Sequence, residues 1–167
     1  MKFLPIALTA FVLSIFSTDF EKLWREDFSQ LTELKSFTPY PSEKPHYQMG
    51  DFFGDGQLDH VFKATDSTGR VCIVFVNEGK ERSIVFLGGD RDPFGITDYE
   101  WAEDFRKVAA GQVLWSNFTE ERRSFEEVPD EEKIVNDHDA LFVHAVGSCG
   151  GGFIYWKDEA FHWLQQE

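Results

Sequence analysis

The sequence GDFFGDGQLD occupies residues 50–59 and runs directly into a strand-like segment. Asp51, Asp55 and Asp59 stand at positions 1, 5 and 9 of the loop counted from the first aspartate. The two glycines between them permit the positive φ angles that such a tight loop needs. Three converging carboxylates repel one another unless a cation neutralises them, and Ca²⁺ prefers oxygen ligands of this kind. The segment therefore predicts a calcium loop that leads into a β-strand.

The loop differs from an EF-hand at two positions. Phe53 and Phe62 stand where an EF-hand has Asp or Asn at position 3 and Glu at position 12. The remaining ligands would be water and four protein groups, namely the side chains of Asp51, Asp55 and Asp59 and the backbone carbonyl of Gln57. Because Ca²⁺ takes about six to eight oxygens, we expect a weak site. A Gly/Asp-rich turn without metal is the alternative interpretation.

The composition indicates a folded, acidic, single-domain protein. The chain has 167 residues, a formal net charge of −14 and 16% aromatic residues. This charge argues against nucleic acid and anionic membranes as partners. The aromatic content favours β-structure and is untypical of disordered chains.

Residues 1–17 have the pattern of a secretory signal peptide. Lys2 precedes an apolar run that ends at Phe16, and Ser17 is a small residue suited to a cleavage site. The run is short for a membrane-spanning helix, which needs about 20 apolar residues. We therefore expect a secreted or periplasmic protein that is not inserted in a membrane after cleavage. An uncleaved anchor is the alternative.

Residues 18–167 are expected to form one β-rich domain that begins with an amphipathic helix over residues 18–37. Thr18 and Glu21 form a capping box, and apolar residues recur at helical spacing after it. Three prolines within residues 38–49 end the helix and predict a stiff connector to the aspartate loop.

Most of the remaining chain has strand patterns. Apolar or alternating runs separated by short turns predict an antiparallel meander over residues 61–64, 71–76 and 82–87. Further strands are expected within residues 106–116 and 134–146, followed by an aromatic hairpin over residues 153–164. The fold class is therefore mainly antiparallel β with an N-terminal helix.

Residues 50–59 resemble the calcium-loop repeat of the FG-GAP type, found in integrin α-subunit propellers and many secreted bacterial proteins. The repeat has the pattern G-D-F-[ND]-G-D-G-x-x-D before a strand, and Phe53 is the marked position that departs from it. The resemblance implies ligands from Asp51, Asp55, Asp59 and the Gln57 carbonyl, with weak Ca²⁺ binding because Phe53 replaces a ligand. The glycine-rich turn and aromatic hairpin also resemble small secreted bacterial proteins that carry one such loop. A propeller needs at least four blades of four strands, so we expect a propeller-blade-like meander in a compact domain.

No pair of residues in the sequence predicts a catalytic site. Ser148 and Cys149 lie beside three glycines, and His138, His144 and His162 are possible bases. Nucleophilic catalysis requires nucleophile and base within hydrogen-bond reach, which the sequence does not provide. A tight glycine-rich turn explains the segment equally well.

The two cysteines allow one disulfide. Cys72 and Cys149 belong to a chain expected to be exported, where such bonds form. Cys72 lies in an apolar run, where a lone cysteine also serves as a small buried hydrophobe. Both interpretations stay open.

These observations predict an exported, acidic, non-catalytic domain that binds a protein or a glycan. The first alternative is an inhibitor or immunity protein that neutralises a basic extracytoplasmic enzyme or toxin, because the negative charge would steer it onto a basic partner. The second alternative is a hydrolase of unknown substrate.

Overall fold

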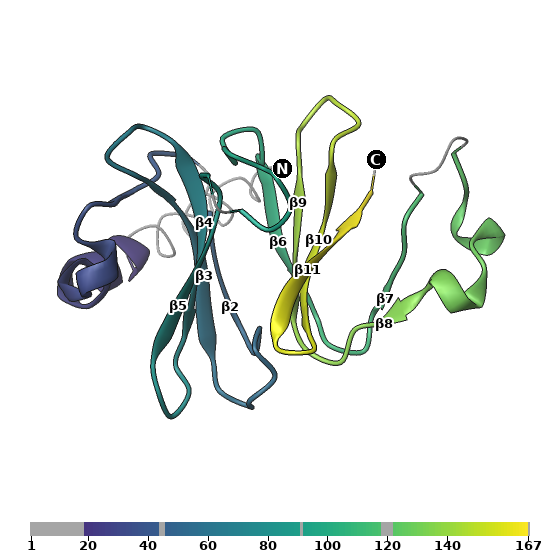
Figure 1. Cartoon of the computed structure of the whole chain (residues 1–167), viewed down its shortest axis with the longest axis horizontal. Helices are drawn as coiled ribbons and strands as arrows, with labels where there is room; N and C mark the ends of the chain where they lie inside the picture. The colour runs from purple at the N-terminus through teal and green to yellow at the C-terminus, as the bar shows by residue number, and fades with distance from the viewer. Residues whose placement is uncertain (1–18, 44–45, 91, 118–121, 167) are drawn as a thin grey trace, which may run out of the picture.

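The computed structural model describes residues 19–43, 46–90, 92–117 and 122–166. Two antiparallel sheets pack face to face, with the N-terminal helix on the outer side of the first and a two-stranded arm beyond the second (Figure 1). The predicted class, mainly antiparallel β with an N-terminal helix, is confirmed. The predicted signal peptide lies outside the described residues.

The first sheet is built around β3 and β4. Its strands are β1 (Thr38–Pro39), β2 (Tyr47–Gly50), β3 (Asp59–Thr65), β4 (Val71–Asn77) and β5 (Ser83–Leu87). The order is β1-β3-β4-β5, and β2 pairs with the other part of the same edge of β3. The predicted meander is confirmed. The predicted connector over residues 38–49 instead supplies two short edge strands, since proline is tolerated at a sheet edge.

The second sheet has the order β11-β10-β9-β6. Its strands are β6 (Asp104–Val108), β9 (Ala140–His144), β10 (Gly151–Lys157) and β11 (Ala160–Gln165). The predicted C-terminal hairpin is confirmed as β10 and β11. Each of the longer strands expected within residues 106–116 and 134–146 is divided in two, because the chain leaves the sheet to form an arm.

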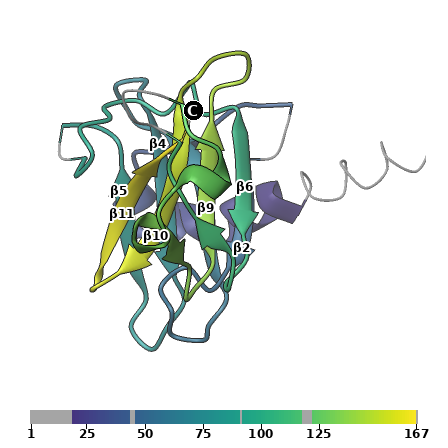
Figure 2. The same cartoon turned by 90° about the vertical axis from the view of Figure 1, so that its right-hand side faces the viewer.

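The arm lies between β6 and β9 in the sequence. It pairs β7 (Val113–Leu114) with β8 (Ile134–Val135) and carries the short 3₁₀ helices η3 (Phe125–Glu127) and η4 (Asp130–Glu132). Figure 2 shows the arm on the outer face of the second sheet. Leu114 from the arm packs against Phe142 and Phe153 of that face.

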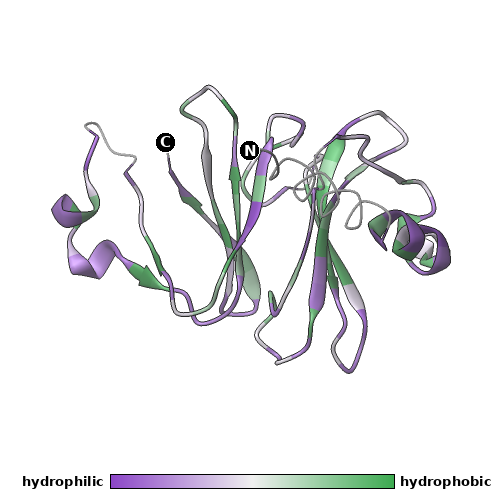
Figure 3. Cartoon of the chain, turned by 180° about the vertical axis from the view of Figure 1, so that it is seen from behind, coloured by the Kyte–Doolittle hydropathy of each residue, from purple (hydrophilic) through white to green (hydrophobic). Residues whose placement is uncertain are grey.

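The main core lies between the two sheets. Ile73 and Phe75 of β4 pack there against residues of the second sheet that include Leu141 and Phe161. Val74 and Val76 point to the opposite face of β4 and pack with the N-terminal helical segment. Because β4 is buried on both faces, its apolar run does not alternate. Figure 3 shows hydrophobic strands at the centre and hydrophilic loops and helix surfaces around them.

The predicted single helix over residues 18–37 is wrong in its extent. Residues 19–26 are α-helical, followed by the 3₁₀ helices η1 (Phe28–Gln30) and η2 (Thr32–Leu34). Leu31 is extended between them, with φ −68° and ψ 133°. This break lets both Phe28 and Leu34 pack into the apolar cluster on the first sheet, where they are fully buried. Packing thus overrides the helical periodicity. No helix within the described ranges has the length and apolar character needed to cross a membrane.

Candidate functional site

The aspartate loop, residues 51–58, connects β2 to β3 at one end of the sandwich (Figure 1). Gly50 and Asp59 are paired in the register of the two strands, so the loop begins and ends at adjacent positions. Gly54 and Gly56 have φ angles of 73° and 79°, the left-handed conformation expected from the sequence.

The carboxylate of Asp51 organises the turn. Its Oδ1 accepts hydrogen bonds from the backbone N–H groups of Gly54 at 2.7 Å and Asp55 at 3.1 Å. Its Oδ2 accepts one from Gly56 at 3.0 Å. These bonds wrap the backbone around the first predicted ligand.

Asp59 is the buried carboxylate of the site. Its Oδ2 accepts hydrogen bonds from Phe52 N at 2.9 Å and Phe53 N at 3.2 Å, and its Oδ1 accepts one from Glu78 N at 3.1 Å. Its side chain has no solvent exposure. Burial raises the pKa of Asp59 to about 6; the three N–H donors oppose the rise and the Asp55 carboxylate adds to it. A nearby cation would favour the charged form.

The structure brings the three predicted side-chain ligands together. One carboxylate oxygen from each of Asp51, Asp55 and Asp59 lies within 4.8 Å of the other two. Gln57 donates its backbone N–H to Asp55 Oδ1 at 2.9 Å, and its carbonyl stays a predicted ligand. The donor set is all oxygen, which suits Ca²⁺. The group could therefore hold one hard cation.

Phe53, which departs from the repeat pattern, belongs to the core. Its ring lies 4.8 Å from Trp156 and 5.2 Å from Phe161, measured between ring centroids. Both partners belong to the second sheet. The position that supplies a ligand in the repeat therefore anchors the loop to the C-terminal hairpin here.

Asp139, just before β9, is a member of the site that sequence reasoning missed. Its Oδ2 accepts a hydrogen bond from Asp51 N at 3.1 Å, and its own N–H donates to Asp51 O at 3.0 Å. Lys107 Nζ lies 3.3 Å from the same carboxylate. A Cβ added at Gly50 would lie 2.4 Å from Asp139 Oδ2, which explains the glycine there. Since Asp139 is 88 residues from Asp51, no local pattern could have revealed this pair.

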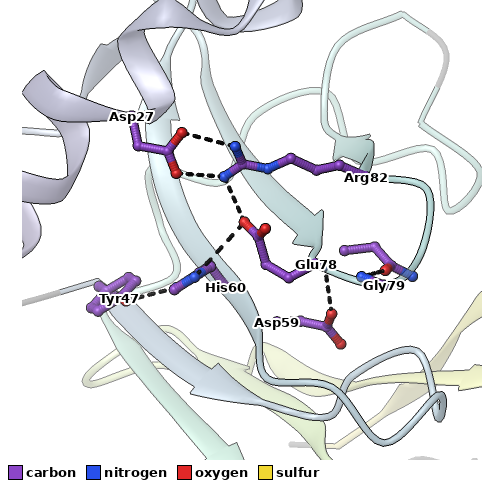
Figure 4. Close-up of polar contacts among 8 residues, drawn as sticks. Asp27, Tyr47, Asp59, His60, Glu78, Gly79 and Arg82 are labelled. Atoms are coloured by element: carbon purple, nitrogen blue, oxygen red, sulfur yellow. Dashed lines mark hydrogen bonds and ion pairs between the residues drawn. The ribbon is translucent and has the colours of Figure 1, made fainter.

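A polar network joins the loop to the N-terminal helical segment (Figure 4). Glu78, which donates its N–H to Asp59, also places its carboxylate against Arg82 and 3.9 Å from His60 Nε2. Arg82 in turn donates to both carboxylate oxygens of Asp27, at 2.8 and 2.6 Å.

Two pKa shifts follow from this network. The hydrogen bonds from Arg82 hold the pKa of Asp27 below its usual value. Burial lowers the pKa of His60, whose Nδ1 lies 2.8 Å from the hydroxyl of Tyr47. Glu78 and Arg82 both lie in the β4–β5 turn, so their contacts with Asp59 and Asp27 hold that turn between the aspartate loop and the N-terminal helical segment.

The other residues singled out in the sequence lie elsewhere. Cys72 and Cys149 are free thiols, the first buried in β4 and the second in an exposed turn between β9 and β10. Burial raises the pKa of Cys72 to about 11. The structure therefore holds no bond between them.

The three histidines considered as bases have contacts of their own. A Cβ at Gly54 would lie 2.3 Å from His138 Nε2, His144 stacks on Phe142, and His162 Nε2 lies 3.0 Å from Lys157 O. These contacts give each imidazole a packing or hydrogen-bonding role.

Comparison with known proteins gives one partial similarity. No family model and no solved structure matches the chain. Over 99 residues the chain is 33% identical to the imidazole glycerol phosphate synthase subunit HisF of Clostridium botulinum strain Kyoto, and 32% identical to that of strain Okra. Each match covers 54% of this chain and 38% of the relative. The chain thus spans well under half the length of the curated relatives it matches.

Proposed function

We propose that this chain is an exported, acidic, non-catalytic binding domain whose aspartate loop holds a Ca²⁺ ion. The observation that carries the proposal is the convergence of Asp51, Asp55 and Asp59 oxygens within 4.8 Å. The ion would offset the cost of burying the Asp59 carboxylate. It would also stiffen the junction of the two sheets, because Phe53 and Asp139 join this loop to the second sheet.

We also propose that the first sheet contains a propeller-blade-like unit. Strands β2 to β5 form four consecutive antiparallel strands, which is the composition of one blade. The loop lies between the first two of them. This placement supports the resemblance to a single FG-GAP-type calcium-loop repeat.

The second candidate function is an inhibitor or immunity protein directed at a basic extracytoplasmic enzyme or toxin. The net charge of −14 favours it. Electrostatic steering would make association with such a partner faster at low salt and slower at high salt. An association rate that is unchanged between low and high ionic strength would argue against this candidate.

Two other activities are not part of the proposal. The synthase named for the matched relatives is not carried over, since the similarity spans 38% of their length. A hydrolase remains the third candidate, and Cys149→Ala tests it: loss of a hydrolytic activity in this variant would contradict a non-catalytic domain.

Export is tested by the intact mass of the protein purified from its native host, which should lack residues 1–17.

Thermal unfolding in Ca²⁺ or chelator tests the metal site. We expect a dissociation constant of ~10⁻⁴–10⁻³ M, as in extracellular modules. A hundredfold excess of Ca²⁺ over that constant stabilises the folded state by about 2.7 kcal/mol. The wild type should therefore melt at a higher temperature in roughly 10–100 mM Ca²⁺, which is that hundredfold excess, than in chelator.

Two variants make this test specific. Asp55→Ala should lose the response to Ca²⁺ because it removes a ligand from the cluster. Asp66→Ala, at the far end of β3, should keep the response even if the variant is less stable. If Ca²⁺ changes the melting temperature of none of the three proteins, the loop is a turn that binds no metal.

A further inference from the structure

An aromatic groove lies at the opposite end of the sandwich from the aspartate loop. It has a volume of about 500 Å³ and lies between the loop that precedes β6, the β9–β10 turn and β11. Phe94, Trp101 and Trp163 form its aromatic walls, and Ser148 and Gln165 supply polar groups. Figure 1 shows the β9–β10 turn and the loop before β6 at this end. The volume lies within the range of small-molecule sites, which is roughly 300–1,000 Å³.

The loop that carries Phe94 and Trp101 is held in place by partly buried hydrogen bonds. Asp92 Oδ1 accepts N–H bonds from Phe94 at 2.8 Å and from Ile96 at 3.1 Å. Asp92 Oδ2 accepts one from Gly88 N at 2.6 Å. Tyr99 is fully buried and donates its N–H to Val71 O at 2.9 Å, which ties the loop to β4. The aromatic wall is therefore formed before any ligand arrives, and this lowers the entropic cost of binding.

The three glycines beside Ser148 and Cys149 lie next to this groove, and the last of them makes room for one of its indoles. A Cβ on Gly152 would lie 2.6 Å from Trp163 Cζ2, so the indole packs directly against the backbone of β10. Trp101 stacks on Tyr99, with 5.8 Å between ring centroids. Each indole is thus supported on one side by the protein and lines the groove.

The groove is neutral in a strongly charged protein. Charged residues make up 28% of the chain, yet among the residues that the structure describes, none that lines the groove is Asp, Glu, Lys or Arg. The net charge of −14 disfavours anionic ligands, and the lining offers a cation no carboxylate partner. The ligand that fits is neutral, with apolar faces for the indoles and hydroxyls for the amide and hydroxyl groups of Gln165 and Ser148. Pyranose rings have this chemistry, since their C–H faces are apolar and their edges carry hydroxyl groups.

We propose that this groove binds a neutral glycan, with a pyranose ring stacked on Trp101 or Trp163. The inference rests on the proposed binding function and names its ligand class. It is independent of the metal, because the groove and the aspartate loop lie at opposite ends of β3 and β4. Loss of Ca²⁺ binding would therefore leave glycan binding intact as long as the protein stays folded.

Titration calorimetry of the full chain with neutral oligosaccharides tests the proposal. The probes are oligomers of glucose, of xylose and of N-acetylglucosamine, each measured in Ca²⁺ and in chelator. We expect at least one series to bind, and Trp101→Ala and Trp163→Ala each to weaken it about tenfold, as loss of one aromatic stacking contact implies. Trp115→Ala is the matched control, because Trp115 packs on Phe125 in the arm, away from the groove.

Several results would overturn the inference. The first is that none of the three oligosaccharide series binds. The second is that both Trp101→Ala and Trp163→Ala bind as tightly as the wild type. The third is that Trp115→Ala weakens binding as much as the groove substitutions do. A proline-rich peptide, titrated in the same way, that binds more tightly than every oligosaccharide would also overturn it. If Trp163→Ala fails to fold, Trp101→Ala and Gln165→Ala decide the outcome. Glycan binding without any Ca²⁺ response would remove the metal proposal alone.

Discussion

The two ends of strand β3 each carry an aspartate that caps a turn. The pKa values of these two carboxyl groups are shifted in opposite directions. Asp59, at the first end, accepts three backbone N–H bonds. Asp66, just after the last residue of β3, accepts two backbone N–H bonds and two from side chains, those of Thr68 and Arg70. The pKa of Asp59 is raised to about 6, whereas that of Asp66 is lowered to about 2.

The difference shows that burial decides whether hydrogen bonds keep a carboxylate charged, because hydrogen bonds, first that of the Thr68 hydroxyl, lower the pKa of Asp66, whereas burial outweighs them at Asp59. Asp59 is fully buried, and Asp55 adds a second negative charge. The Asp66 side chain is 15% exposed, and the Arg70 guanidinium lies 3.3 Å from it. Desolvation disfavours the charged form, whereas hydrogen bonds to the carboxylate, first from the Thr68 hydroxyl and last from the Arg70 side chain, favour it. A bound Ca²⁺ would give Asp59 the counter-charge that Arg70 gives Asp66.

Truncating Phe53 should break the aspartate loop, with the largest effect of the changes considered. Phe53→Ala removes a ring that packs between the two sheets, and loss of a buried Phe costs about 3–5 kcal/mol of unfolding free energy. Ser67→Ala, in the exposed turn beside Asp66, is the matched change and should stay within about 0.5 kcal/mol of wild type. Urea unfolding measures both. Similar losses in the two variants would contradict the view that only the first turn is anchored in the core.

In the presence of chelator, the contributions of the two aspartates to folding stability should change in opposite directions with pH. Asp59 has a folded pKa near 6 against an ordinary value of 3.8, so the folded state holds the proton longer than the unfolded state. Its contribution to stability therefore falls by about 3 kcal/mol as pH rises from 3.8 to 6. Asp66 stabilises the fold above pH 3.8, and this contribution is lost as pH falls toward 2. Carboxyl ¹³C NMR titration gives both pKa values, and a pKa near 3.8 for Asp59 would contradict the predicted loss of stability between pH 3.8 and 6.

Removing the cation beside Asp66 should make the two ends more alike, with the smallest effect. In Arg70→Gln the pKa of Asp66 should rise only slightly, because the hydrogen bond from the Thr68 hydroxyl, the largest cause of its lowering, remains, while the pKa of Asp59 stays unchanged. The pair is partly exposed, so its loss should cost no more than about 1 kcal/mol of unfolding free energy. The same NMR titration follows both carboxyls. An Asp66 pKa that does not move would assign its shift to the turn hydrogen bonds alone.

Much of the fold could be predicted from local patterns. The alternating and continuous apolar runs located β3, β4 and β5, and the aromatic pairs around a short turn located the C-terminal hairpin. The helix was predicted too long because its apolar spacing continues through Leu31 and Leu34. Only the position of the first sheet determines that the chain must break there, and this information is not local.

The candidate site was predicted in part for the same reason. Asp51, Asp55 and Asp59 converge as their spacing indicates, because one short loop holds all three. Asp139 was missed, since it comes from the second sheet, and the core role of Phe53 depends on Trp156 and Phe161, which are also distant in sequence. The sequence indicates a tight glycine-rich turn near Gly152, but packing of Trp163 against Gly152 in β10, which explains why a side chain is excluded there, is not a local signal.

The most direct test of the metal site is the pKa of Asp59 with and without Ca²⁺, measured by carboxyl ¹³C NMR. In chelator we expect a value near 6. In saturating Ca²⁺ the value should fall to its ordinary value of 3.8 or lower, because the cation favours the carboxylate, and Ca²⁺ added at pH 5 should release close to one proton. The pKa of Asp66 serves as the internal reference and should stay where it is. An Asp59 pKa that is the same in Ca²⁺ and in chelator would contradict a metal ion in this loop.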